Sequence, residues 1–174
     1  KSSFTKPENV RPPTLAETVL SRDGHDWTRP IIQGPRDIGF DSSLMTVGGI
    51  QDPPYKWARD GYYVQPENFR WYEHNTTYET ANGISKINYP GEGSHDWDST
   101  IYNMILVNET RRFLDDHTSN PSYYDKPFFF YLPLGAVHIP HTPPYTYLDG
   151  SPVAGVYPTT HMDMLGEVDK VVGS

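Results

Sequence analysis

The chain has 174 residues with a formal net charge of −8, a pI near 5.2 and no cysteine. This acidic balance, with no basic cluster larger than Arg111-Arg112, excludes the electrostatic surface of a nucleic-acid-binding protein. The lack of cysteine excludes disulfides, thiolate metal sites and a cysteine nucleophile within these residues, and no apolar run approaches the about 20 residues of a membrane span.

The first part of the sequence predicts little regular structure. Residues 1–28 are a polar, proline-bearing lead-in with one short helix over 15–20, for which Thr14 and Glu17 form a capping-box pattern. Residues 29–97 contain turn signals but no long periodic segment. We therefore expect residues 29–97 to be irregular and rich in loops.

Residues 98–174 predict a core made of a helix, a strand, a loop and a second helix. The first helix is expected from Thr100 to about His117, capped by Asp98 or Ser99. Its apolar side chains recur at helical spacing, which predicts a buried face formed by Ile101, Met104, Ile105 and Phe113.

A second helix is expected from about Thr160 to Val172, with Gly173 as its C-cap. Its apolar side chains predict a buried face formed by Leu165, Val168 and Val172. The pattern favours solvated positions for its charged and titratable residues, which are His161, Asp163, Glu167 and Asp169.

An unbroken apolar run, Phe128–Leu132, lies between the two helices. A run without polar alternation is typical of a strand that is buried on both faces in a parallel sheet. Such a strand needs hydrogen-bonded neighbours on both sides, and the sequence offers only weak candidates for them. We therefore expect an interior strand of a larger sheet whose other strands lie outside these 174 residues.

Two histidines, His138 and His141, lie in the proline- and glycine-punctuated turn after this run. Sites in open α/β sheets are built beyond the carboxyl ends of the strands, so both are candidate substrate-binding residues. The alternative is a pair of solvated loop histidines. No metal site is predicted, because no carboxylate accompanies the pair.

Two tripeptides match the N-glycosylation acceptor pattern, beginning at Asn75 and at Asn108. Together they favour a secreted or lumenal protein, in a lysosomal, extracellular or periplasmic setting. The first residues lack the apolar core of a signal peptide, so we expect the start of the chain to be mature, processed or truncated.

Several segments resemble the sulfatases, a family of the alkaline-phosphatase-like superfamily, and they occur in the family's order. The most specific are the strand and the His-x-Pro turn, followed by a proline-rich loop and a helix. The matching segments are Gly34–Asp41, Asp52–Tyr55, Lys126–Leu132, Val137–His141 with Pro144, and His161–Gly173. Thr14–Glu17 resembles the helix that precedes the family's Gly-Lys-Trp-His motif.

This resemblance implies an α/β, alkaline-phosphatase-like fold, rich in loops, with a mostly parallel central sheet flanked by helices. It also implies hydrolysis of sulfuric esters through a formylglycine nucleophile and a calcium ion. His138 matches the histidine that contacts the sulfate group, whereas His141 lies where the family varies. The formylglycine motif, the calcium-binding Asp-Asp and Asp-Asn residues and the Gly-Lys-Trp-His motif are absent.

We therefore interpret the chain as an internal portion of one sulfatase catalytic domain, inactive by itself. The expected partners are a sulfated small molecule or carbohydrate and the remainder of the sulfatase chain. Two alternatives stay open: a catalytically inactive sulfatase-like protein with a structural or carbohydrate-associated role, and a phosphodiesterase or phosphatase of the same superfamily.

Overall fold

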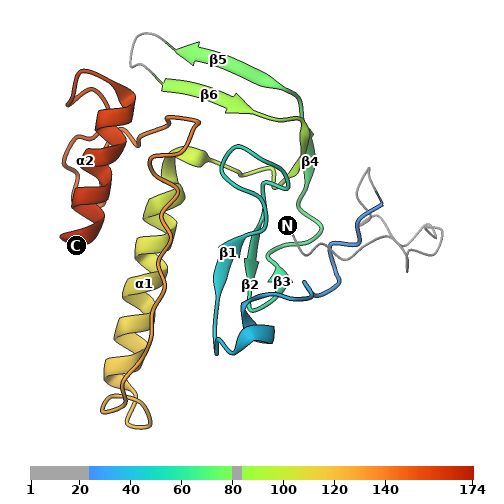
Figure 1. The fold of residues 1–174 in the computed structure, drawn as a ribbon, viewed down its shortest axis with the longest axis vertical. Helices are drawn as coiled ribbons and strands as arrows, with labels where there is room; N and C mark the ends of the chain where they lie inside the picture. Colours follow the sequence, from blue (N-terminus) through green and yellow to red (C-terminus); the bar gives the residue numbers. More distant parts are fainter. Residues whose placement is uncertain (1–23, 80–83) are drawn as a thin grey trace. The chain divides into compact units, whose positions relative to one another are not determined.

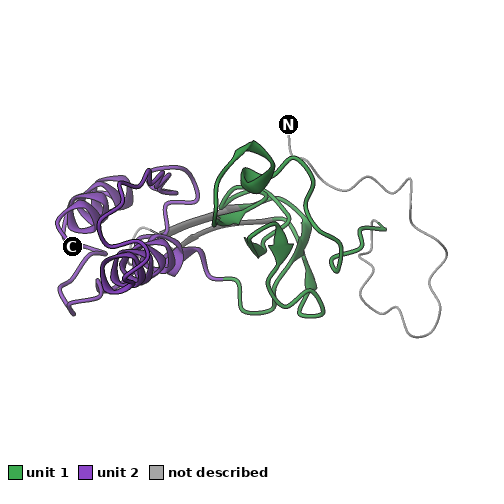
Figure 2. Cartoon of the chain, turned by 90° about the horizontal axis from the view of Figure 1, so that it is seen from below, with its two compact units in different colours: residues 1–75, 88–97 green, residues 76–87, 98–174 purple. Residues whose placement is uncertain are grey.

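The computed structural model describes residues 24–79 and 84–174, and the chain divides into two compact units (Figure 1, Figure 2). Unit 1 comprises residues 1–75 and 88–97, and unit 2 comprises residues 76–87 and 98–174. The helix predicted over residues 15–20 lies outside the described residues. Within the described residues, no helix is both long and apolar enough to cross a membrane.

Short strands occupy much of the region in which the sequence predicts irregular loops. The antiparallel sheet β1-β2-β3 sets Leu44 opposite Arg59 and Ala58 opposite Tyr63, and β4 is antiparallel to β7. The strands are β1 (Leu44–Thr46), β2 (Trp57–Arg59), β3 (Tyr62–Tyr63), β4 (Arg70–Tyr72), β5 (Asn75–Glu79), β6 (Ile84–Asn88) and β7 (Gly91–Gly93). A pattern of period two is hard to detect in strands of two to five residues.

The core of unit 1 is aromatic. One cluster consists of Trp27, Ile31, Ala58 and Tyr63. Tyr55 is fully buried. Its backbone N–H donates to the C=O of Glu92 on β7, and its C=O accepts from the N–H of Ser94, just after β7. Alanine at Gly93 would place its Cβ 2.4 Å from the Cβ of Tyr55, so this approach requires glycine.

Lys56, next along the chain, is also buried, and its Nζ donates to the backbone carbonyls of Gln65 and Asn68. Burial lowers the pKa of the Lys56 ammonium to about 8, and the carboxylates of Glu67, Asp96 and Glu92 oppose this shift. Lys56 therefore links the segment just before β2 to the turn before β4.

Unit 2 contains both long helices, and their bounds confirm the prediction closely. A short 3-10 turn, η3 (Ser99–Ile101), leads into α1 (Tyr102–Ser119), and the side chain of Asp98 accepts a hydrogen bond from the N–H of Thr100. Helix α2 (Thr160–Val172) has Gly173 as its C-cap. Capping residues can be recognised in the sequence, and they predict where the helices begin and end.

The buried faces of these helices differ from the predicted ones. Helix α1 buries Asn103, Leu106 and Val107, whereas the predicted Ile101 is exposed. Helix α2 buries Thr160, Asp163, Met164, Glu167 and Val171, whereas the predicted Leu165 and Val172 are exposed. The expectation that Asp163 and Glu167 are solvated is therefore wrong. Both side chains find hydrogen-bond partners inside unit 2, so they lie on the packed face instead of being excluded from it.

The N-cap of α2 is Thr159, whose hydroxyl accepts a hydrogen bond from the N–H of Met162 at 3.2 Å. Replacing Thr159 with alanine is expected to lower the free energy of unfolding of unit 2 by about 1 kcal/mol, because a helix N–H loses its acceptor. Urea unfolding followed by the helical circular dichroism signal measures this loss. Thr159→Ser keeps the hydroxyl and is the control, and an equal loss in both variants would contradict a capping role.

The apolar run Phe128–Leu132 does not form a strand in this structure. The chain turns after α1 and runs back along it in an extended conformation (Figure 1). Phe128 and Phe130 both contact the ring of Phe113 on α1, with ring centroids 5.2 Å apart in each pair. Phe129 and Tyr131 are 76% and 68% exposed. The predicted interior strand is therefore not formed within the described residues. The strands β1-β2-β3 and β4-β7 pair in antiparallel sheets, so they do not form the predicted parallel sheet either.

Candidate functional site

The turn that follows this extended segment holds His138 at the surface of unit 2. The turn closes through a hydrogen bond from the N–H of His138 to the C=O of Gly135, 3.0 Å long. The imidazole is exposed, and its Nδ1 lies 2.5 Å from the carbonyl oxygen of Ile139. Because a carbonyl oxygen only accepts, Nδ1 carries a proton in this contact. The Nε2 atom then accepts when the ring is neutral and donates when the ring is charged.

His141 and His161 lie against each other beside this turn. Their ring centroids are 5.1 Å apart and the rings meet edge to face. His141 is half-buried, whereas His161 lies exposed on the first turn of α2. Burial lowers the pKa of the His141 imidazole, and charge repulsion from His161 and from His138 lowers it further. The structure therefore gathers the two predicted site histidines with a third that the sequence pattern assigned to solvent.

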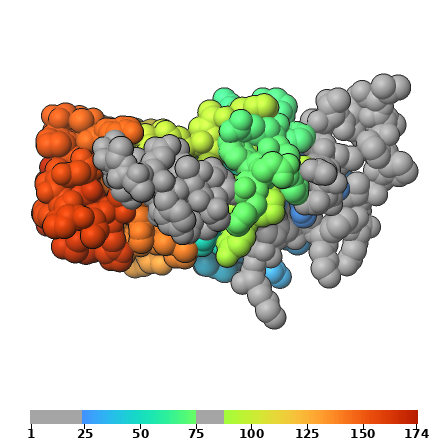
Figure 3. Space-filling view, turned by 90° about the horizontal axis from the view of Figure 1, so that it is seen from above, coloured from blue at the N-terminus to red at the C-terminus, as the bar shows by residue number. Residues whose placement is uncertain are grey.

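The loop between His141 and α2 is tied down at both ends. Thr142 is buried and donates from Oγ1 to the hydroxyl of Ser99. At the other end the carboxylate of Asp163, on α2, accepts from the N–H groups of Gly155 and Tyr157, each at 2.8 Å. The loop and α2 pack closely in the space-filling view (orange and red in Figure 3). The loop that carries His141 is therefore fixed to the rest of unit 2 by these hydrogen bonds.

Beneath the turn lies the buried pair of Asn103 and Glu167. The amide Nδ2 of Asn103 donates to Oε2 of Glu167 at 3.0 Å. Burial raises the pKa of the Glu167 carboxyl to about 7, and the hydrogen bond from Asn103 opposes the shift. The other oxygen of this carboxyl, Oε1, has no hydrogen-bond partner within the described residues.

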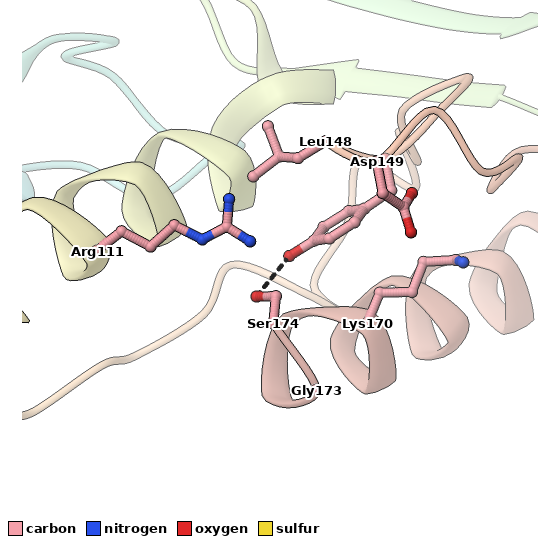
Figure 4. A pocket seen from close by; sticks show the side chains of 7 residues that line it. Arg111, Leu148, Asp149, Lys170, Gly173 and Ser174 are labelled. Carbon is pink, nitrogen blue, oxygen red and sulfur yellow. Dashed lines mark hydrogen bonds between the residues drawn. The ribbon is translucent and has the colours of Figure 1, made fainter.

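One pocket of unit 2, of about 410 Å³, lies away from these histidines (Figure 4). It is lined by Arg111, Tyr147, Leu148, Asp149, Lys170, Gly173 and Ser174. The hydroxyl of Tyr147 donates to Oγ of Ser174, and the ammonium of Lys170 donates to Oγ of Ser151. Structural contacts already occupy these polar groups, so the histidine cluster is the better candidate site.

Within residues 24–79 and 84–174, no group of three or more histidine, aspartate or glutamate side chains is placed to hold a metal ion. The sulfatase resemblance implies calcium with ligands outside this chain, and this stays a prediction. Of the two glycosylation candidates, Asn108 is exposed on α1 and Asn75 begins β5.

Comparison with solved structures finds proteins of similar fold. A glycosaminoglycan sulfatase of Bacteroides thetaiotaomicron, described in connection with the metabolism of multiple glycosaminoglycans, aligns with 88% of this chain at a TM-score of 0.58 and 22% sequence identity. This chain spans only 35% of the length of that protein. No family model matches the sequence, and no curated protein is significantly similar to it. The likeness shows a shared fold, a mixed α/β arrangement that corresponds to about a third of a sulfatase chain.

The sequence indicates His138 and His141 as candidates, and their role stays a prediction. It assigns His161 and Glu167 to solvated positions and does not single out Asn103. A signal for Glu167 was present, because it lies three residues after Met164 and four before Val171, on the stripe that becomes buried. An acidic residue inside an apolar stripe indicates a buried, hydrogen-bonded carboxyl. No comparable local signal marks His161, which reaches the site only because the loop folds back onto α2.

Proposed function

We propose that this chain is a central part of a sulfatase catalytic domain, and that His138 binds the sulfate ester. The whole enzyme would hydrolyse sulfate esters on aryl or carbohydrate substrates. The observation that carries the proposal is the exposed imidazole of His138, on a closed turn and with Nδ1 bonded to a backbone carbonyl. The shared fold with a glycosaminoglycan sulfatase supports it.

The chemistry of this imidazole suits a sulfate ester. With Nδ1 occupied by the carbonyl of Ile139, only Nε2 is available to a ligand. In its charged form Nε2–H donates to an ester oxygen, and such a donor stabilises the negative charge that develops there as the S–O bond breaks. His141 and His161 lie beside the turn of His138, and their ring N–H groups are further hydrogen-bond donors for ester oxygens.

The remaining catalytic parts would come from outside this chain. A formylglycine, made from cysteine or serine in the family's motif, would supply the nucleophile, and that motif is absent here. Calcium would require ligands that the described residues do not offer, so we assign it no step through this chain. The partners would be a sulfated substrate and the rest of the polypeptide, in a secreted or lumenal setting.

The extended segment Phe128–Leu132 fits this proposal. Phe128 and Phe130 contact the ring of Phe113 on α1 and are still 50% and 37% exposed. Phe129 and Tyr131 are more exposed. Exposed aromatic side chains on one extended segment form an apolar patch that favours burial. We propose that strands outside the 174 residues cover this face and complete the parallel sheet, which places His138 beyond the carboxyl end of an interior strand.

The test uses the full protein that contains this chain, assayed with an aryl sulfate. His138→Ala is expected to lower kcat/KM by about 10²- to 10³-fold, because a donor to the developing charge is lost. His138→Gln keeps an amide donor and should lose less. His95→Ala, on an exposed loop of unit 1, is the matched control and should leave turnover unchanged.

Three outcomes would contradict the proposal. Unchanged turnover in His138→Ala would remove the assigned role of this residue. Hydrolysis of phosphate esters in preference to sulfate esters would favour a phosphatase or phosphodiesterase, and no turnover at all would favour an inactive sulfatase-like protein. The 174-residue chain alone is expected to be inactive, and saturable turnover by it would show that the missing parts are not needed.

A further inference from the structure

A continuous path of hydrogen bonds joins helix α2 to the backbone of His138. Oε2 of Glu167 accepts from Nδ2 of Asn103 at 3.0 Å, and Oδ1 of Asn103 accepts from the N–H of Gly135, also at 3.0 Å. The C=O of Gly135 in turn accepts from the N–H of His138 at 3.0 Å. Asn103 lies on α1, so this path crosses from one helix to the other and then into the turn.

The two side chains in this path are screened from water. Asn103 is 4% exposed and Glu167 is 1% exposed. In such surroundings a lost partner leaves a buried polar group unsatisfied, which costs more than the same loss at the surface. The orientation of the amide is also determined, because the backbone N–H of Gly135 only donates and must face the amide oxygen.

We infer that Asn103 is a positioning residue for His138, holding the start of its turn through the N–H of Gly135, with Glu167 fixing the orientation of the Asn103 amide. This inference rests on the proposed role of His138 in binding a sulfate ester. Asn103 and Glu167 do not touch the substrate in this arrangement. They determine where the turn begins and therefore where the imidazole is presented.

Asp163 and Glu167 are both buried on α2, but only Glu167 is bonded to Asn103 and so belongs to the path that leads to the turn. On α2, Asp163 is held by the N–H groups of Gly155 and Tyr157, Lys170 is held by Ser151, and His161 lies at the surface. On the loop, His138 and His141 carry the imidazoles of the site, and Arg111 on α1 faces the separate pocket.

The experiment measures amide hydrogen exchange at Gly135 and the NMR signal of the His138 ring in the full protein that contains this chain. In the unmodified chain the Gly135 amide is expected to exchange slowly. Asn103→Leu, of similar size but without an acceptor, should speed exchange at Gly135 about tenfold and shift the His138 ring signal. Glu167→Gln still accepts from Asn103 and should keep both signals at their original positions.

Tyr147→Phe is the matched control, because it removes a buried hydrogen bond of the same unit that does not lead to the turn. It should leave Gly135 and His138 unchanged. If Asn103→Leu does not fold, Asn103→Ala serves instead, since it also removes the acceptor for the N–H of Gly135 and should likewise speed exchange there and shift the His138 ring signal. Fast exchange at Gly135 in the unmodified chain, or an unshifted His138 ring in folded Asn103→Leu, would overturn the inference.

The readouts separate this inference from the proposed function. A slow Gly135 amide and a shifted ring in Asn103→Leu, together with full turnover in His138→Ala, would support the positioning and refute the sulfatase role of His138. An unshifted His138 ring in Asn103→Leu, together with lost turnover in His138→Ala, would refute the positioning role of Asn103 and leave the sulfatase role of His138 intact.

Discussion

Raising the pH from about 4.5 to about 7 is expected to destabilise unit 2 by about 3 kcal/mol through Glu167. Burial raises the pKa of this carboxyl from 4.5 to about 7 in the folded chain. Between these values the folded state keeps a proton that the unfolded state releases, so stability is full below pH 4.5 and falls as the pH rises. The measurement is urea unfolding across this range, followed by the helical circular dichroism signal, since α1 and α2 belong to unit 2.

Glu167→Gln is the comparison for this prediction. Glutamine can accept the same hydrogen bond from Asn103 but does not ionise, so the difference in stability between the two proteins should change with pH across the window. Asp169→Asn, at an exposed position on the same helix, should not alter the pH dependence. A constant difference between Glu167→Gln and the unmodified chain from pH 4 to 8 would show that Glu167 ionises in the folded state as it does in water.

Replacing Tyr55 with alanine is expected to lower the free energy of unfolding of unit 1 by about 4 kcal/mol, in the range measured for buried aromatic side chains. Tyr55 is 0% exposed, and its ring contacts those of Tyr72 and Trp97. Its hydroxyl lies within hydrogen-bond distance of the carbonyls of Gln51 and Tyr89, at 2.6 and 2.7 Å. The substitution therefore leaves a cavity and also removes a hydrogen-bond donor from these carbonyls.

Tryptophan fluorescence measures this loss, because all four tryptophans lie in unit 1 (Trp27, Trp57, Trp71 and Trp97). Tyr62→Ala is the matched control, since Tyr62 lies on β3 with an exposed ring and should cost little. Tyr55→Phe keeps the ring and should lose only the contribution of the hydroxyl, about 1–2 kcal/mol. Equal losses in Tyr55→Ala and Tyr62→Ala would show that Tyr55 does not hold the core of unit 1.

The helices of unit 2 show how much local sequence can define. Helix α2 begins and ends where the sequence predicts, because Thr159 and Gly173 supply its caps from within one turn of the chain. Helix α1 likewise follows Asp98, whose carboxylate accepts from the N–H of Thr100. Because a cap forms between residues close in the sequence, the ends of a helix can be predicted from the sequence.

The buried faces could not be predicted in the same way. Hydrophobicity alone favours Leu165 and Val172 for burial, yet α2 buries Asp163 and Glu167 and exposes both apolar residues. Asp163 is buried because two backbone N–H groups of the loop need an acceptor, and Glu167 because Asn103 donates to it from another helix. Their partners are distant in the sequence or depend on the path of a loop, so no periodic pattern reveals them.

The sequence by itself determined the helix bounds, the order of the segments and the two candidate histidines of the site. Only the tertiary structure decided that His161 joins them, that a buried amide lies beneath the turn, and that Phe129 and Tyr131 stay exposed. The physical reason is the range of the interactions: caps and turns are made between near neighbours, whereas burial depends on which distant surface each side chain meets.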